Sequence, residues 1–507
     1  MTSQQRILVN TLAQYTRTIL NVCLALYSTR IILHALGQTD YGIYMLVAGV
    51  VSMLSFVTNA LVTTTQRYLS FYQGKGDTAQ VYSIFSNSML LHIAIGLAVF
   101  LILALSDWPL VYHVLNIEPE RMFTAAIVFV LASLMLFFSI IIAPFRALLF
   151  SHENIVYISL IDVFDGILKL LCAFLLLHLT SDRLIAYSVS MLGIQVFNLF
   201  ALAVYAAVKY EECHLPKLSE FDKSCVRSLA SFAGWSVYGS GCVVARNQGI
   251  AVILNLFFGT VINAAYGLAM QVAGAVMFVS ASIVNAVNPQ LMKAEGEGNR
   301  KRMIRLAEYE SKYSFLFLAL LSLPLIFEMD ALLNWWLTEV PEYTVEFCQI
   351  VLLATLCDQL TIGLTAVNQA IGDIKHFTVW FYSAKLLTLI GIVVCLLLGT
   401  NVTIALCSYI LVELLDSFLR IPLVKRKADI DVLQFCRNVF LRVIMPVVVV
   451  VAVCWSCVTF VSVPYRFLLT LLLSLIAAVP VIWLTTFDSM EKQYIKNYIT
   501  LRHARVG

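Results

Sequence analysis

Long apolar runs separated by short polar segments dominate the chain. A helix that crosses a bilayer needs about 20 mostly apolar residues, because the hydrocarbon core is about 30 Å thick and a helix rises about 1.5 Å per residue. Fourteen windows meet this requirement, at 9–36, 41–68, 82–106, 122–149, 156–179, 184–208, 231–258, 262–290, 312–333, 346–371, 377–399, 402–424, 440–461 and 465–487. The pattern therefore predicts an all-α polytopic membrane protein with about 14 transmembrane helices.

Composition strengthens this prediction. Of 507 residues, 61% are hydrophobic and 12% are charged, which is more apolar side chain than one soluble core hides. The N-terminal stretch MTSQQRILVNTLAQYTRTILNV has no compact apolar core followed by a small-residue cleavage site. We therefore read it as the first span and not as a removed signal peptide.

The distribution of charge predicts the orientation. Lys and Arg gather on one side of the fourteen-span arrangement, whereas the opposite loops are mostly acidic. Since cytoplasmic loops carry the excess of Lys and Arg, we expect both termini to be cytoplasmic. The basic clusters lie beside span ends, where anionic membrane lipids already account for them, so nothing indicates nucleic acid.

Cysteine and histidine spacing does not indicate a metal site or a cofactor. Cys454 and Cys457 have CxxC spacing but lie inside an apolar span, where packing between helices is the favoured interpretation. The eight histidines have no ligand spacing. We expect neither a metal nor a cofactor.

An internal duplication relates the first two predicted helices to the seventh and eighth. Landmark residues recur at separations of 222 to 225 residues, in the pairs Gly37 with Gly259, Tyr41 with Tyr266, Gln66 with Gln290 and Gly74 with Gly296. Any two apolar hairpins look somewhat alike, but these landmarks are mostly glycine and polar residues. Six helices per copy is an even number, so the duplication predicts two parallel six-helix lobes with a cleft between them.

The predicted organisation has four parts. An N-terminal six-helix lobe covers 1–208, a cytoplasmic linker helix covers 209–230, and a C-terminal six-helix lobe covers 231–427. Two additional helices and a cytoplasmic tail make up 428–507. The linker has a short apolar stripe that favours a helix on the membrane surface, although a plain solvated linker fits equally well.

The stretch GCVVARNQGIAVILNLFFG places Arg246, Asn247 and Gln248 inside the seventh predicted span. Arg246 lies about 20 Å from either end of that span at about 1.5 Å per residue. A lone arginine at that depth costs at least about 2.5 kcal/mol, so we expect it to face protein or a water-filled cavity. Because no acid lies on its own helix, the cavity is favoured.

Other charged residues at membrane depth accompany Arg246. Asp162, Asp165 and Lys169 share one face of the fifth helix, where Asp165 and Lys169 are placed to pair. The first helix carries Arg17 and Arg30 toward its ends. The second half adds Asp358, Lys385, Glu413, Asp416 and Arg420.

These residues support two interpretations. A hydrated cationic cavity would receive an anionic, polar ligand, because guanidinium groups suit phosphate and amides suit hydroxyls. Its candidate lining residues are Arg246, Arg30, Arg17, Asn247, Gln248 and Lys385. Alternatively, opposite charges simply join helices, as for Asp165 with Lys169 or Glu413 with Arg420. Candidates for ion coupling or structural pairing are Asp162, Asp165, Lys169, Asp358, Glu413 and Asp416.

The chain resembles a known group of transporters. The stretches ARNQGIAVILNLFFGTVINAAYGLAMQV, SIVNAVNPQLMKAEGEGN and LGQTDYGIYMLVAGVVSMLSF are similar to bacterial polysaccharide (O-antigen-type) oligosaccharide flippases. These belong to the multidrug/oligosaccharidyl-lipid/polysaccharide exporter superfamily, and the resemblance covers nearly the whole chain. It implies a V-shaped pair of six-helix lobes plus two C-terminal helices, with the first, second, seventh and eighth helices lining a central portal.

The resemblance also implies a task. An undecaprenyl-diphosphate-linked oligosaccharide would move from the cytoplasmic to the external leaflet of the bacterial inner (cytoplasmic) membrane, for surface polysaccharide or lipopolysaccharide synthesis. Arg246 and Arg30 would receive the diphosphate, Asn247 and Gln248 would meet sugar hydroxyls, and the tail would stay among membrane lipids. Expected partners are this lipid-linked oligosaccharide, protons or sodium, and polysaccharide assembly proteins. We expect alternating access without bond chemistry, hence a transporter and not an enzyme.

Two other functions compete with this hypothesis. A multidrug efflux carrier of the same superfamily would favour an acidic cavity, whereas the portal helices supply Arg17, Arg30 and Arg246. A membrane-embedded polysaccharide polymerase fits less well, because the chain has no sizeable loop that carries paired catalytic carboxylates.

Overall fold

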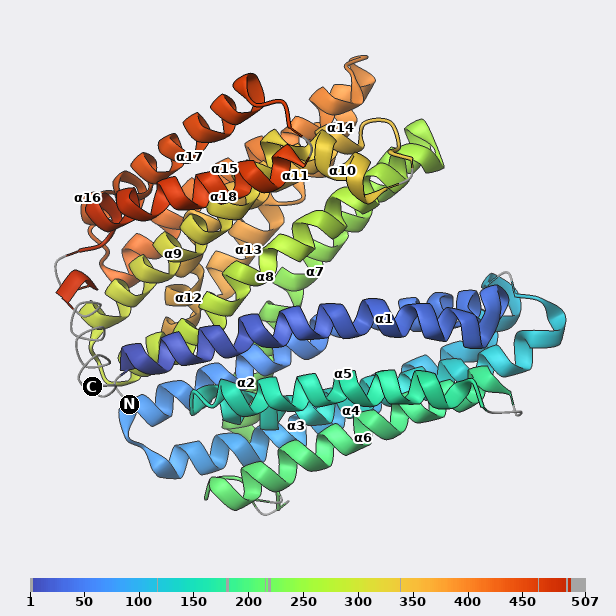
Figure 1. The fold of residues 1–507 in the computed structure, drawn as a ribbon. Helices are drawn as coiled ribbons and strands as arrows, with labels where there is room; N and C mark the ends of the chain where they lie inside the picture. Colours follow the sequence, from blue (N-terminus) through green and yellow to red (C-terminus); the bar gives the residue numbers. More distant parts are fainter. Residues whose placement is uncertain are drawn as a thin grey trace, which may run out of the picture. The chain divides into compact units, whose positions relative to one another are not determined.

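Helices occupy all fourteen predicted spans in the computed structural model (Figure 1). It describes residues 3–115, 117–178, 182–214, 216–217, 220–337, 339–463, 465–488 and 491–493. No strand occurs within these ranges. The predicted tail after residue 493 lies outside the described residues.

The first half of the element order runs from α1 to α8. Its helices are α1 (Ser3–Ser52), α2 (Ser55–Lys75), α3 (Thr78–Pro109), η1 (Leu110–Val114), η2 (Pro119–Arg121), α4 (Met122–Ser151), α5 (Ile155–Leu176), α6 (Arg183–Lys209), α7 (Lys223–Phe258) and α8 (Thr260–Gly296). The second half has shorter and more frequently broken helices. They are α9 (Arg300–Phe327), α10 (Met329–Trp336), α11 (Thr344–Gln359), α12 (Ile362–Ile371), α13 (Lys375–Ala384), α14 (Leu387–Leu397), α15 (Val402–Ala428), α16 (Val432–Asn438), α17 (Phe440–Phe460), α18 (Arg466–Val481) and η4 (Ile482–Thr486).

Length and apolar composition qualify most of these helices as membrane spans. Eleven described segments pass by themselves, and α11 with α12 makes a twelfth if the pair, bent by 45°, is one span. The predicted spans 41–68 and 156–179 are helical but are not among these segments. The first contains the break between α1 and α2, and the second carries three charged side chains on α5. Numerous large apolar side chains elsewhere are exposed, as expected of a multi-pass membrane protein.

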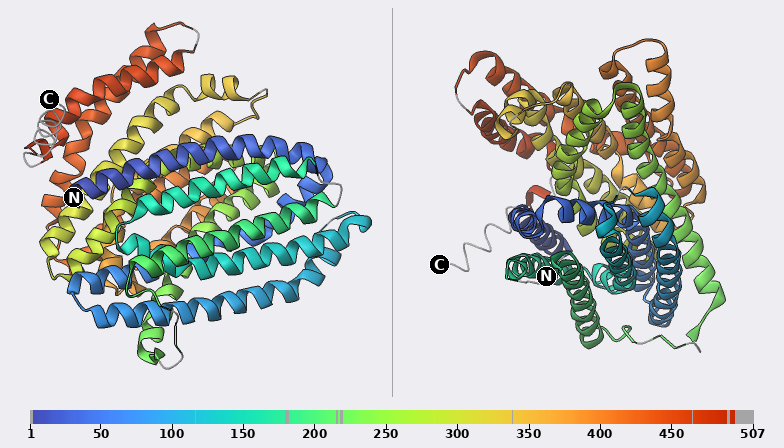
Figure 2. Two further views of the ribbon diagram at one scale, coloured as in Figure 1. Left: turned by 60° about the horizontal axis from the view of Figure 1, so that its bottom comes forward. Right: turned by 90° about the vertical axis from the view of Figure 1, so that its right-hand side faces the viewer.

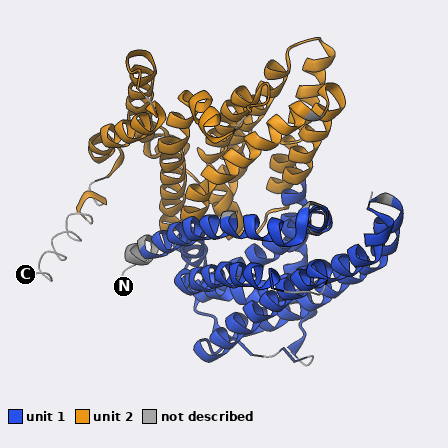
Figure 3. Cartoon of the chain, turned by 45° about the vertical axis from the view of Figure 1, so that its right-hand side comes forward, with its two compact units in different colours: residues 1–241, 285–299 blue, residues 242–284, 300–507 orange. Residues whose placement is uncertain are grey.

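The described chain divides into two compact units (Figure 3). Unit 1 comprises Met1–Gly241 and Asn285–Asn299, and unit 2 comprises Cys242–Val284 and Arg300–Gly507. Both α7 and α8 therefore contribute residues to each unit.

In unit 1, α4 is the central helix. It packs against α2, α3 and α6, while α1 lies along α5 (Figure 2). The close approach of α3 to α4 depends on Gly96, because a Cβ there would lie 3.2 Å from the ring of Phe137. The buried Phe129 of α4 anchors the apolar core between these helices.

In unit 2, α9 and α15 hold the bundle together. α15 packs against α11, α12, α13 and α14, and α9 packs against α11, α12, α17 and α18. The last two helices, α17 and α18, also pack against each other. The two C-terminal helices thus share one apolar core with α9.

The linker between α6 and α7 differs from the predicted surface helix over 209–230. Its described residues between Lys209 and Lys223 form turns and short irregular segments, and α7 then begins at Lys223. Pro216 lacks the N–H that a helix interior needs. The Asp222 carboxylate accepts a hydrogen bond from the Ser224 N–H and so caps the start of α7.

The duplication recurs in the backbone. Gly37 and Gly259, which are equivalent in the two copies, have φ angles of 79° and 81°. Glycine adopts this region without the steric cost that a Cβ imposes. Gly37 interrupts the helical backbone within α1, and Gly259 separates α7 from α8, so a glycine with positive φ breaks the helix at equivalent positions of the two copies.

A second pair of equivalent glycines forms a reciprocal contact inside unit 1. A Cβ on Gly74 of α2 would overlap the carbonyl group of Lys293, and a Cβ on Gly296 of α8 would overlap that of Phe71. The absence of a side chain at Gly74 thus lets the backbone of α8 approach just before Gly296. In the same way, Gly296 lets the backbone of α2 approach just before Gly74. Glu153 reinforces this contact by accepting hydrogen bonds from Gln290 (3.0 Å) and Lys293 (3.2 Å).

We predict that Gly296→Ala lowers the melting temperature of the detergent-solubilised protein. The added methyl group forces α2 and α8 apart, and overpacking of this kind costs about 1–3 kcal/mol. Gly267→Ala is the matched control on the same helix, because nothing lies within 4 Å of its Cβ position. Equal melting temperatures for the two variants would contradict the close contact.

The linker supplies a pH-dependent prediction. The hydrogen bonds from the Ser86 hydroxyl (2.6 Å) and the His214 ring (2.9 Å) lower the pKa of Glu220 from 4.5 to about 2. A lowered carboxyl pKa stabilises the fold above about pH 4.5, and this contribution disappears as pH falls toward about 2. The melting temperature of Glu220→Gln should therefore lie below wild type at neutral pH and converge with it in acid. A difference independent of pH would exclude this role of the charge.

Candidate substrate cavity in unit 2

Arg246 lies on the part of α7 that belongs to unit 2 and is only 4% exposed. Its guanidinium donates a hydrogen bond to Glu413 of α15 and lies 4.6 Å from the centre of the Tyr409 ring. Its Nε donates to the side chain of Asn247 at 3.1 Å. The charge of Arg246 is thus balanced by an acid on α15, because α7 itself supplies no acid for it.

Lys385 is the second cation of this cluster and lies at the break between α13 and α14. The positive charge at the C-terminus of α13 suits the negative end of the helix dipole. Its ammonium group donates to Glu413 at 2.5 Å and to Asp358 at 3.2 Å, and it lies 3.8 Å from Asp416. Glu413 is therefore shared by Arg246 and Lys385.

Arg420 donates a hydrogen bond to a backbone carbonyl at the break between α11 and α12. Its Nη1 donates to the main-chain carbonyl of Asp358 at 2.5 Å, and its Nη2 donates to the Asp358 carboxylate at 2.6 Å. A broken span leaves carbonyl groups without helical partners, and these need other donors at membrane depth. Arg420 supplies one such donor and also pairs with the carboxylate beside it.

These charged groups surround a cavity of about 300 Å³ in unit 2. Three cationic side chains line it, namely Arg246, Lys385 and Arg420, together with the two carboxylates of Asp358 and Glu413. Polar contributions come from Asn247, Thr355, Thr365, Tyr382 and Tyr409, and apolar ones from α8 and Phe381. The cavity thus offers charges of both signs beside an apolar wall.

The structure brings together three of the predicted lining residues, namely Arg246, Asn247 and Lys385. Gln248 follows on the same helix but is exposed and does not line this cavity. Asp358 and Glu413 line the cavity as well, and Asp416 lies next to Lys385. One carboxylate oxygen of Asp416 is buried without a hydrogen bond in the described part of the chain.

The remaining predicted residues belong to unit 1. Arg17 pairs with Asp162 at 2.8 Å, and Asp162 also accepts a hydrogen bond from Arg146 at 2.5 Å. Lys169 forms a direct ion pair with Asp165 at 2.7 Å, and the two residues lie one helical turn apart on α5. Arg30 is exposed and makes no hydrogen bond or ion pair with the residues that are described.

Sequence reasoning missed two features of the cluster. Glu413 and Arg420 do not pair with each other, because seven residues separate them by about 10 Å along a helix axis. Glu413 binds Arg246 and Lys385, while Arg420 binds Asp358. The aromatic ring against Arg246 was the second missed feature. Tyr409 lies four residues before Glu413 on α15, and residues i and i+4 share one helix face, so this spacing could have indicated that Tyr409 also faces Arg246.

The fold is similar to those of solved transporters. A point mutant of MATE matches with a TM-score of 0.75 and 12% identity, over 85% of this chain and 97% of that one. The chain has the MATE transporter fold. A MOP superfamily transporter from Pyrococcus furiosus matches with a TM-score of 0.73 and 11% identity, over 85% of this chain and 96% of its own. Its binding pocket is described as having reverse polarity, which suggests a different function for that protein.

A third transporter with the MATE fold, ClbM in complex with Rb⁺, matches with a TM-score of 0.70 and 13% identity, over 86% of this chain and 96% of its own. Among curated proteins, the uncharacterized membrane protein EpsK of Bacillus subtilis (strain 168) is 20% identical over 312 residues. This match covers 62% of the present chain and 61% of EpsK. No family model matches the chain. The likeness to solved MATE structures confirms the fold that the sequence resemblance implied.

We predict that Glu413→Gln is the most destabilising single substitution among the charged residues around the unit 2 cavity. Removing one partner of a buried ion pair costs about 3–5 kcal/mol, and here it leaves two cations without their shared acid. Asp416→Asn should cost less, because one carboxylate oxygen of Asp416 has no hydrogen bond to a described residue and Lys385 is 3.8 Å away. Thermal unfolding in detergent measures both, and an equal loss of stability would contradict the assigned role of Glu413.

Proposed function

We propose that this protein is a bacterial inner-membrane transporter that flips an undecaprenyl-diphosphate-linked oligosaccharide from the cytoplasmic to the external leaflet. The observation that carries the proposal is the lining of the unit 2 cavity, where three cations face two carboxylates. The guanidinium groups of Arg246 and Arg420 suit an anionic head group, because a guanidinium offers phosphate two parallel donors. The MATE fold supports a transport function.

Exchange of partners at Glu413 gives the cavity a way to receive the diphosphate. Arg246 leaves Glu413 for a phosphate oxygen, while Glu413 keeps its 2.5 Å contact with Lys385. The carboxylate therefore never lies buried without a cation, which would be costly at this depth. Asn247 and the Tyr382 hydroxyl supply hydrogen-bonding groups for sugar hydroxyls. The polyprenyl tail remains in the lipid.

Helix breaks fit a transport cycle. α11 and α12 are bent at Thr361, and α13 and α14 are interrupted at Lys385, so both breaks place charges on the cavity. Discontinuous helices of this kind typically form the binding sites of secondary transporters, whose repeats alternate access by rigid-body motion. Asp162 and Asp165 in unit 1 and Asp358, Glu413 and Asp416 in unit 2 are the candidates for coupling to protons or sodium.

A second candidate function is export of cationic drugs. It is favoured by the MATE fold itself and by Asp358 and Glu413, which would bind a drug cation in place of Lys385. The two functions place opposite demands on the same cavity. Oligosaccharide flipping requires Arg246 to leave Glu413 so that it can bind the diphosphate. Drug export requires Asp358 and Glu413 to leave Lys385 so that they can bind the drug cation.

Complementation separates the two functions. We expect the chain to restore surface glycan in a bacterium that lacks its oligosaccharide flippase, with no change in drug resistance. Drug resistance without surface glycan would replace the proposed function with the second candidate. Polysaccharide assembly proteins of the host are the expected partners in this assay.

Arg246→Gln tests the contact with the head group, and we expect it to abolish restored surface glycan. The double variant Arg246→Gln with Glu413→Gln removes both charges of the pair and leaves only Lys385 without this acid, so it should be more stable than Glu413→Gln alone. If Arg246 only neutralises Glu413, the double variant also recovers glycan export; if Arg246 binds the diphosphate, export stays absent. Arg426→Gln, an exposed cation on α15 outside the cavity, is the control and should keep wild-type export.

A further inference from the structure

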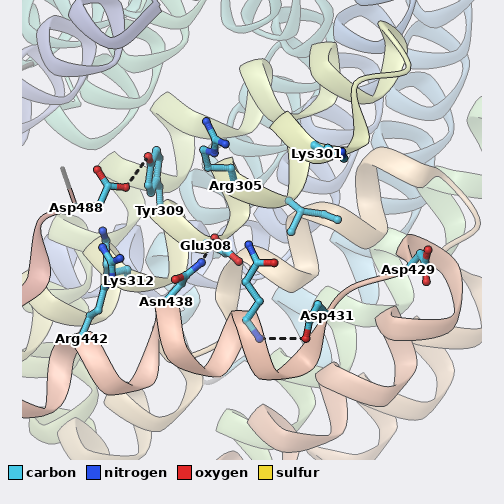
Figure 4. Close-up of a pocket in the computed structure, with 12 residues that line it drawn as sticks. Lys301, Arg305, Glu308, Tyr309, Lys312, Asp429, Asp431, Asn438, Arg442 and Asp488 are labelled. Carbon is cyan, nitrogen blue, oxygen red and sulfur yellow. Dashed lines mark hydrogen bonds between the residues drawn. The ribbon is translucent and has the colours of Figure 1, made fainter. Parts of the chain in front are cut away.

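A second cavity of unit 2 lies where α9 begins and α15 ends (Figure 4). Its volume is about 420 Å³. The lining comes from the first turns of α9, from α16, from the start of α17 and from the segments beside them. The lining residues are Lys301, Ile304, Arg305, Glu308, Tyr309, Lys312, Asp429, Asp431, Gln434, Asn438, Arg442 and Asp488.

Charges of both signs line this cavity in equal number. The cations are Lys301, Arg305, Lys312 and Arg442, and the carboxylates are those of Glu308, Asp429, Asp431 and Asp488. Several of them have structural partners. Lys312 binds Glu491 at 2.9 Å, Glu308 accepts a hydrogen bond from Asn438 at 2.9 Å, and Asp431 caps the N-terminus of α16.

Arg305 and Asp429 do not have such partners. Both are exposed, and neither side chain forms a hydrogen bond or an ion pair with any described residue. Figure 4 shows Arg305 on α9 above the cavity, Arg442 toward its left side and Asp429 with Asp431 toward its right side. Asp429 is the C-cap residue of α15. It has a φ of 54°, and its backbone N–H donates a hydrogen bond to the carbonyl of Lys425.

Exposed leucines lie close in sequence to residues that line the cavity. Leu433 and Leu441 each lie next to a lining residue in the sequence and are 80% and 62% exposed. Leu484, on η4 shortly before Asp488, is 71% exposed. Because α9, α15 and α17 are long and apolar enough to span a membrane, we expect their ends, and with them these leucines, to lie at the level of the lipid head groups.

We propose that this cavity binds the head group of an aminophospholipid such as phosphatidylethanolamine. Its phosphate lies between Arg305 and Arg442, its primary ammonium lies toward Asp429 and Asp431, and its acyl chains lie along the exposed leucines. A purely anionic head group would meet four carboxylates, and a purely cationic ligand would meet four cations. A group that carries both charges satisfies both sides. This site is independent of the cargo in the other cavity.

Three phospholipids test the match of charges. Phosphatidylcholine has the same phosphate but a trimethylated ammonium without N–H donors, and phosphatidylglycerol has a phosphate but no amine. We expect phosphatidylethanolamine, added to the purified full-length protein in detergent at equal mole fraction, to raise the melting temperature more than either. Equal shifts for all three lipids, or the largest shift with phosphatidylglycerol, would overturn the proposal.

Variants locate the effect. Arg305→Gln and Asp429→Asn should each remove the additional shift caused by phosphatidylethanolamine, and asparagine tolerates the positive φ at position 429. Arg426→Gln removes an exposed cation near the same end of α15 but outside the cavity, so it should keep the shift. Native mass spectrometry of folded protein then counts bound lipid directly. An unchanged preference in both cavity variants would show that the lipid binds elsewhere.

Discussion

The cost of a charge at membrane depth determines how unit 2 is assembled. Arg246 is tolerated on α7 only because α15 supplies Glu413, and Glu413 in turn holds Lys385 at the break between α13 and α14. Asp358 on α11 joins the same cluster through Lys385 and Arg420. Four segments that are distant in sequence thus meet at one set of charges, and they leave a polar cavity where a fully apolar bundle would close.

Much of the fold could be predicted from the sequence because its signals are local. Apolar runs located the helices, and the spacing of Asp165 and Lys169 indicated their pairing one turn apart. The cluster could not be predicted in the same way, since Arg246 and Glu413 are separated by 167 residues and no local rule selects that partner. The apolar pattern also runs through Thr361 and Lys385, so it did not reveal that two spans break there.

The two cavities of unit 2 use charge differently. Around Arg246 every cation has an acidic partner, and the side chains are buried, so any ligand must exchange one strong contact for another. Around Arg305 several charges face solvent, where ion pairs contribute little to stability. Binding at the first cavity is therefore governed by the loss of existing ion pairs, and binding at the second by complementarity with groups that are already available.

The contact of Gly74 with Lys293 and of Gly296 with Phe71 has the pattern of an isologous interface, in which each side repeats the other. In a symmetric dimer of separate chains, one mutation would change both sides at once. Here both copies lie on a single polypeptide, so each glycine can vary while its counterpart is kept. A substitution can therefore alter one of the two contacts in this helix crossing and leave the other as it is.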